Sequence, residues 1–236
     1  MRGAWIAALV LAATPVAAAP DASIRPEHRP AHAEGAEGPA ATSPLPRARP
    51  VRPAAAPGTV PQPPAPGLLC GIPGLKGERR APIAAQVNGC GIANPVRLTE
   101  VSGVRLSEPA DVDCSIAVAL DTWVRTVLQP GFDNRVRQLD VAGAYVCRGR
   151  NRVAGAKISE HGRGRAIDIR SLVMTDGSRV SVARDWNRGD AGRRMVEAYT
   201  RGCGIFGTTL GPGSDGYHED HMHFDVPLTR RSPYCR

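Results

Sequence analysis

SEHGRGRAIDIR, residues 159–170, predicts a loop that leads directly into a β-strand. Gly162 and Gly164 disfavour a continuous helix across the seven residues that separate His161 from Asp168. The last five residues alternate in character, as expected for a strand with one buried face. Ile167 and Ile169 should therefore face the core, while the Asp168 carboxylate lies on the opposite face.

A second segment, HEDHMHF at residues 218–224, has the same alternation. Side chains two residues apart share a strand face, so His221 and His223 should project together, with Met222 and Phe224 turned to the core. If the two strands pair, Asp168 and His223 come side by side.

The distribution of histidines favours a metal site. The chain has 6 histidines, and every one after residue 32 lies in these two segments, next to acidic residues. A single histidine is more often an ordinary polar side chain than a metal ligand. A cluster of histidines beside acidic residues is more often a metal site. Catalytic zinc typically has three protein ligands and an open position for water. We predict that His161, Asp168 and His223 bind Zn²⁺.

Both segments resemble known zinc signatures. Ser159-x-His161-x-x-Gly164-x-Ala166-x-Asp168 is similar to the first signature of the D-Ala-D-Ala carboxypeptidase and dipeptidase metalloenzymes. His218-x-x-His221-x-His223 resembles the second signature of the penicillin-insensitive murein endopeptidases. Both groups belong to the zinc peptidase superfamily named after lysostaphin, the D-Ala-D-Ala metallopeptidases and hedgehog.

From about Cys70 to Arg236 the chain more closely resembles the bacterial extensin-like family. Besides the Ser159 segment, the residues that carry this resemblance are Tyr145-Val146-Cys147-Arg148, Asp185-Trp186, Leu210-Gly211-Pro212 and Tyr234-Cys235-Arg236.

The superfamily resemblance implies zinc-assisted hydrolysis of an amide bond, because zinc lowers the pKa of bound water to about 7 and polarises a carbonyl. It implies that His221 is the general base or stabilises the transition state, and that His218 assists or binds substrate. Asp220 is the alternative base, since the carboxypeptidase branch has an acidic residue at that position. The segment that ends in Arg148 is similar to one in the carboxypeptidase branch whose arginine holds the substrate carbonyl. The resemblance therefore implies the same role for Arg148.

Three regions are expected along the chain. Residues 1–19 have the charged start, apolar stretch and small residues of a secretory signal, and the stretch is too short to span a membrane. Residues 20–66 contain thirteen of the 22 prolines and few large apolar side chains, which predicts a disordered linker. Residues 67–236 should form one domain, resembling the extensin-like and zinc peptidase-like proteins.

The domain should have an α+β fold, a small antiparallel sheet with flanking helices, resembling the hedgehog and D-Ala-D-Ala peptidases. It carries all 6 cysteines, which behind a signal peptide indicate three disulfides, although fifteen pairings are possible. Periodicity predicts helices at 111–128 and 189–199, strands ending at 147, 210 and 226, and a hairpin over 167–182 with its turn at 175–178.

The formal net charge of +8 does not indicate nucleic-acid binding, because basic residues are not interleaved with aromatic ones. A bacterial periplasmic or secreted location, with no stable membrane insertion after signal cleavage, makes peptidoglycan peptides or another anionic cell-wall polymer the expected partner. Two hypotheses follow: a zinc metallopeptidase acting on peptidoglycan peptides that contain D-amino acids, either endopeptidase or carboxypeptidase, and a non-catalytic zinc-containing wall-binding or structural protein.

Overall fold

The computed structural model describes residues 67–85, 87, 89–229 and 232–236. The predicted signal peptide, 1–19, and the predicted linker, 20–66, lie outside this part of the chain. No helix within the described ranges is long and apolar enough to cross a bilayer.

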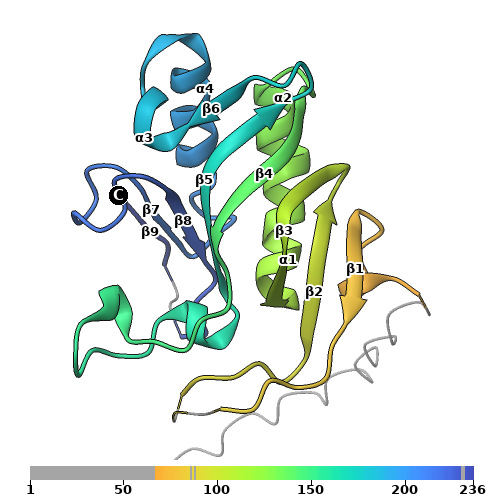
Figure 1. The fold of residues 1–236 in the computed structure, drawn as a ribbon, viewed down its shortest axis with the longest axis vertical. Coiled ribbons are helices and arrows are strands. Elements are labelled where there is room, and N and C mark those ends of the chain that lie inside the picture. Colours follow the sequence, from red (N-terminus) through yellow and green to blue (C-terminus); the bar gives the residue numbers. More distant parts are fainter. Residues whose placement is uncertain (1–66, 86, 88, 230–231) are drawn as a thin grey trace, which may run out of the picture. The chain divides into compact units, whose positions relative to one another are not determined.

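A single sheet organises the described residues (Figure 1). Its nine strands are β1 (Leu75–Arg79), β2 (Pro95–Val101), β3 (Val104–Asp113), β4 (Val136–Gly143), β5 (Ala166–Met174), β6 (Arg179–Ser181), β7 (Thr208–Leu210), β8 (Met222–Asp225) and β9 (Tyr234–Cys235).

The sheet order is β1-β2-β3-β4-β5-β8-β7-β9, and β6 pairs with β5. Most neighbours are antiparallel, but β3 pairs with β4 and β7 pairs with β9 in parallel. The expected α+β class is confirmed, but where a small antiparallel sheet was expected the sheet is mixed and has nine strands. The helical segment between β3 and β4 returns the chain to the starting end of the sheet, which makes a parallel pair possible.

In the view of Figure 1, α1 (Cys114–Trp123) lies behind β3 and β4. A π-helical turn (Val124–Leu128) and α2 (Gln129–Gly131) continue α1, and α3 (Val182–Asp185) and α4 (Gly189–Thr200) follow β6. Short 3-10 segments span Leu69–Gly71, Arg150–Arg152 and Glu160–Arg163. The hairpin with its turn at 175–178 and the helix from 189 are confirmed.

The core determines which face of β5 and β8 remains for polar side chains. Trp123 from α1 packs against Phe224 of β8 at a ring separation of 5.0 Å, and its indole N–H donates to the Ala198 carbonyl at 2.8 Å. Ile167 and Met222 belong to the same buried cluster. Because neighbouring residues on a strand point to opposite faces, Asp168 and His223 lie on the other face.

Two boundaries differ by several residues from the sequence expectation, while the strand expected to end at 226 ends one residue earlier, at Asp225. The helix expected to begin at Asp111 begins at Cys114, because residues up to Asp113 extend β3 and Asp113 caps the helix by accepting a hydrogen bond from the Ser115 N–H. The strand expected to reach Cys147 ends at Gly143. Beyond it, the Arg148 carbonyl accepts from the Ser159 N–H at 3.0 Å, so the chain pairs with a loop instead of continuing the sheet.

The three expected disulfides are present: Cys70–Cys114, Cys90–Cys147 and Cys203–Cys235. Each closes a loop of tens of residues and on general grounds contributes about 2–4 kcal/mol. Cys90–Cys147 joins the loop before β2 to the segment after β4. Next to it, the Gly91 N–H donates to the Gly162 carbonyl at 2.8 Å. These links hold the loop that carries His161 against the rest of the domain.

Candidate metal centre

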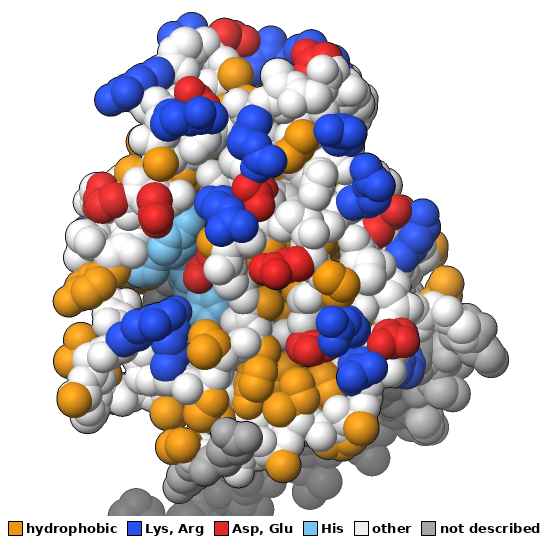
Figure 2. All heavy atoms as spheres, viewed as in Figure 1, with side chains coloured by type: hydrophobic (Ala, Val, Ile, Leu, Met, Phe, Trp, Pro, Cys, Tyr) orange, Lys and Arg blue, Asp and Glu red, His pale blue; other side chains and the backbone are white. Residues whose placement is uncertain are grey.

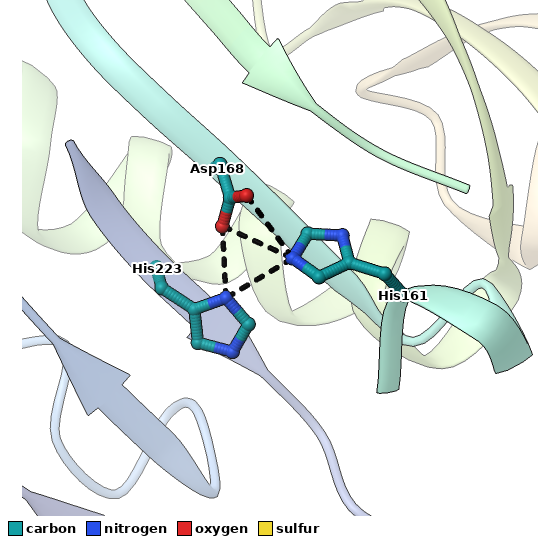
Figure 3. A group of neighbouring side chains, drawn as sticks. All are labelled: His161, Asp168 and His223. Carbon is teal, nitrogen blue, oxygen red and sulfur yellow. Dashed lines mark hydrogen bonds and ion pairs between the residues drawn. The ribbon is translucent and has the colours of Figure 1, made fainter. Parts of the chain in front are cut away.

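Three buried side chains converge on the polar face of β5 and β8 (Figure 3). Asp168 and His223 are direct partners in the register of the two strands. His161 reaches them from the Glu160–Arg163 segment, and one ligand atom from each residue lies within 4.8 Å of the other two. The structure thus brings together the three predicted ligands, named here the metal triad.

The loop before β5 is shaped to aim His161 at the strands. The Ser159 hydroxyl accepts a hydrogen bond from the His161 N–H, which starts the 3-10 turn. Gly164 ends the turn with φ of 65°, and a Cβ there would lie 2.2 Å from Ile92 Cδ1. Only glycine fits this position, because a side chain would be strained and would clash. Two local signals in the sequence therefore place the first ligand.

The hydrogen bonds around the two rings leave their lone pairs facing the Asp168 carboxylate. Nδ1 of His161 donates to the Ala144 carbonyl at 2.6 Å, so in the neutral ring the lone pair is on Nε2. Nε2 of His223 donates to Asp225 at 3.0 Å, which leaves the lone pair on Nδ1. Such outer hydrogen bonds are typical of metal-binding histidines, because they orient the ring and set its tautomer.

The separations between these atoms suit a small cation. His161 Nε2 is 3.2 Å from His223 Nδ1 and 3.1 Å from Asp168 Oδ1, and His223 Nδ1 is 2.8 Å from the same oxygen. Ligands at 2.0–2.1 Å in a tetrahedron would stand about 3.3 Å apart. Three acceptors at this spacing need a positive charge between them, and two imidazoles with a carboxylate fit zinc.

In the metal-free protein, a bound proton can supply part of the positive charge that the three acceptor atoms need. Burial by itself lowers the pKa of His223, but hydrogen bonds with Asp168 and Asp225 outweigh it and raise that pKa to about 9. Burial would raise the pKa of Asp168, yet the hydrogen bonds with His161 and His223 hold it well below its ordinary value. The site therefore keeps one negative carboxylate and one exchangeable proton near neutral pH.

Two further histidines border the metal triad, each paired with a carboxylate. His221 Nδ1 bonds Asp220 at 2.7 Å, and its Nε2 lies 3.8 Å from Asp168 Oδ2. His218 is buried, bonds Asp215 through Nδ1 at 2.7 Å, and its ring stands 5.3 Å from that of His223. Burial and the neighbouring histidines lower the pKa of His218, although Asp215 opposes this.

Arg148 lies beside the metal triad. It lines a large groove together with Asp168 and His221, and it also lines a smaller pocket with His161 and His223. Its Nε is buried and has no hydrogen-bond partner. In Figure 2 the pale blue histidines are visible in a hollow of this face, with basic side chains on either side.

A family model named Extensin-like protein C-terminus matches residues 74–236. The chain belongs to the extensin-like family. Neither the curated proteins nor the solved structures contain a match to it. The match covers the whole metal centre, all the strands and five of the six cysteines of this extensin-like domain.

Three groups in the extensin-like domain hydrogen-bond the histidines of the site and were not predicted from the sequence as their partners. Asp225 lies two residues after His223 on the same strand face, and it bonds His223. Asp215 and the Ala144 carbonyl were missed. Asp215 stands three residues before His218, in a glycine-rich loop where that spacing is a weak signal. A backbone carbonyl gives no sequence signal, because every residue has one.

Zinc binding to the extensin-like domain is expected to release about one proton from His223 near pH 7. Because the pKa of the metal-free residue is about 9, the proton is bound below that pH and must leave before Nδ1 can bind a cation. Apparent affinity should rise about tenfold per pH unit from pH 7 toward 9 and then level off. Competition with a chromophoric chelator across this range measures it.

Asp225→Asn provides the control for this pH dependence. It removes one of the interactions that raise the pKa of His223, so the steep region should move to lower pH. Equal affinities of the wild type at pH 7 and 9, after correction for the chelator, would contradict the assignment of the proton.

Proposed function

We propose that this protein is a secreted or periplasmic zinc peptidase that hydrolyses peptide bonds in peptidoglycan. The observation that carries the proposal is the metal triad with two histidine–carboxylate pairs at its edge, open to a groove. A metal centre kept only for stability needs no such neighbours. The resemblance of both histidine segments to the lysostaphin, D-Ala-D-Ala metallopeptidase and hedgehog superfamily supports a related fold.

His161, Asp168 and His223 would hold the zinc ion. When bound, zinc supplies a Lewis acid that polarises the scissile carbonyl and makes water a nucleophile near neutral pH. The protein must then accept a proton from the attacking water, deliver it to the leaving amine and stabilise the developing negative charge.

We assign proton transfer to His221. Asp220 bonds Nδ1, so Nε2 is free to accept a proton, and it lies at the edge of the metal triad. The Asp220 side chain is 78% exposed and would act through His221, which favours the histidine as the base. His218, held by Asp215 and with a lowered pKa, would be neutral near pH 7 and can bind or assist the substrate.

Arg148 would bind the substrate carbonyl oxygen. Its guanidinium lies at the border of the groove and the smaller pocket, both of which contain metal-triad residues. A guanidinium without an acidic partner is well suited to a developing oxyanion, because its charge is not already neutralised.

The proposed location rests on the disulfides and the sequence. Three disulfides are stable in an oxidising compartment such as the periplasm, and the cytosol would reduce them. The expected signal peptide at residues 1–19 agrees with export. In that compartment the abundant peptide substrate is peptidoglycan.

The test is hydrolysis by the purified, zinc-loaded protein. Intact peptidoglycan and defined muropeptides should release new amino groups, and removing zinc with a chelator should stop the release until zinc is restored. Mass spectrometry of the products identifies the cleaved bond. A protein that retains one zinc ion per chain but yields no new amine from any of these substrates would contradict the proposal.

The second candidate is a non-catalytic zinc protein that binds the cell wall. Burial of all three triad residues favours it, because a metal held by buried ligands can serve stability alone. The two hypotheses predict different results for His221→Ala. A peptidase would lose most of its rate of peptide hydrolysis. A non-catalytic protein would keep its affinity for the cell wall and would show no hydrolysis with or without the substitution.

A further inference from the structure

A groove of about 700 Å³ opens beside the metal triad. It contains Asp168 and His221 and extends to residues of β4, β5, β6 and α3. Its most frequent side chain is arginine. The five arginines that line it are Arg148, Arg152, Arg170, Arg179 and Arg184. We call it the arginine groove.

Two of these arginines already have an acidic partner. Arg170 and Arg179 both pair with Asp140, which also accepts a hydrogen bond from the Ser171 hydroxyl at 2.8 Å. The opposing charges hold the pKa of Asp140 below its ordinary value, although burial acts against this. These three residues form one wall of the groove, and both guanidinium groups share a single carboxylate, so less of their positive charge is left for a ligand.

The other three arginines have no acidic partner. Within the described residues, no carboxylate oxygen lies within ion-pair distance of Arg148, Arg152 or Arg184, whereas the other two arginines of the lining are paired. Arg152 comes from the Arg150–Arg152 segment and Arg184 from α3, so they reach the groove from separate parts of the chain. The remaining carboxylates of the lining are committed: Asp168 to the metal triad and Asp220 to His221.

Five arginines against three aspartates give the lining of this concave site a formal excess of two positive charges, which favours an anionic ligand. Guanidinium binds carboxylate through two parallel hydrogen bonds, and a groove focuses the field more than a flat surface does. The volume falls within the range of about 300–1,000 Å³ found for small-ligand sites, which suits a short peptide segment and not a nucleic-acid duplex.

We infer that the arginine groove binds the free carboxylates of an acidic peptide substrate, with Arg152 and Arg184 as the specificity-determining residues. This rests on the proposed peptidase function for the position of the scissile bond at the metal triad. The binding itself does not require hydrolysis. A peptide segment with two free carboxylates on one side of the scissile bond would occupy the groove, and converting them to carboxamides would remove the attraction.

Binding of matched synthetic peptides to the full-length zinc-loaded protein tests the inference. One set consists of stem peptides with free side-chain carboxylates, and the other of the same peptides with those groups amidated. Calorimetry or fluorescence anisotropy should give about tenfold or more tighter binding of the free acids. The preference should weaken as salt is raised, since both arginines are exposed.

Arg152→Gln/Arg184→Gln is the decisive variant. It should bind free and amidated peptides within about twofold of each other, while retaining zinc and its melting temperature. Arg105→Gln/Arg137→Gln removes the same charge from exposed positions on β3 and β4 outside the groove lining, and it should keep the preference.

The results separate this inference from the proposed function. Preference for free acids that depends on Arg152 and Arg184, without cleavage of any peptide, would support the groove and contradict the peptidase. Cleavage without a carboxylate preference would support the peptidase and overturn the groove. Equal binding of the two peptide sets by the wild type, no measurable binding of either, or an equal loss in the control variant would also overturn it.

Discussion

Replacing His223 with alanine is expected to lower zinc affinity by about 1,000-fold or more, beyond the roughly 10- to 100-fold that follows loss of an outer hydrogen-bond partner. The substitution removes one of three ligands and leaves His161 and Asp168 facing an opening in a buried site. A two-ligand site cannot reproduce the tetrahedral arrangement that zinc prefers. Metal content after dialysis and competition with a chelator give the size of the loss.

His223→Gln provides the second variant, because it keeps more of the volume and can still donate to Asp225. Both substitutions should leave the far-ultraviolet circular dichroism of the metal-free protein similar to that of the wild type, since the core lies on the other face of β8. Asp225→Asn removes only an outer hydrogen-bond partner, so it should lower zinc affinity by roughly 10- to 100-fold. A stoichiometric zinc ion that survives dialysis in His223→Ala would mean that the metal triad is not the binding site.

Replacing His221 with alanine is expected to reduce the rate of peptide hydrolysis by about 100- to 10,000-fold, the contribution typical of a positioned general base. Zinc should remain bound, because His221 is not among the three ligand residues. The combination of retained metal and lost rate distinguishes a proton-transfer residue from a ligand. Rates measured on a defined muropeptide, with zinc content determined for the same preparation, are required.

Asp220→Asn is the matched control for His221. Asp220 bonds His221 through Nδ1 and is mostly exposed, so its loss should reduce the rate less than loss of the imidazole and should shift the pH profile. His218→Ala tests the remaining histidine. If His218→Ala lost the greater part of the rate while His221→Ala kept it, the assignment of the base would pass to His218 and its partner Asp215.

The composition of the metal triad could be predicted because its signals are local. Alternation along residues 166–170 and 221–224 determines which side chains share a face, and glycines around His161 exclude a helix. The pairing of Asp168 with His223 was inferred by assuming that the two strands are neighbours. The register of β5 and β8 confirms that assumption.

The surroundings of the metal triad could not be predicted in the same way. Asp215, the Ala144 carbonyl and the arginines of the groove come from turns and loops whose positions depend on the whole sheet. Arg152 and Arg184 are 32 positions apart in the sequence, and nothing in their local pattern indicates that both line one cavity. Composition merely indicated a basic protein.

The mixed sheet illustrates the same limit. Strand identity follows from short-range periodicity, but the parallel pairing of β3 with β4 depends on how the intervening helical segment packs. Likewise, the cysteine count indicated three disulfides without their connectivity, because pairing is decided by which segments meet after folding.

Residue type and spacing within a few positions were enough to predict the two strands behind the metal triad, the three residues of that triad and the even set of cysteines. The tertiary structure alone decided the sheet order, the disulfide pairs, the carboxylate behind each histidine and the arginine groove. The physical reason is that these features depend on contacts between residues tens of positions apart. Such contacts form only when burial of the common core offsets the entropy of closing the loops between them.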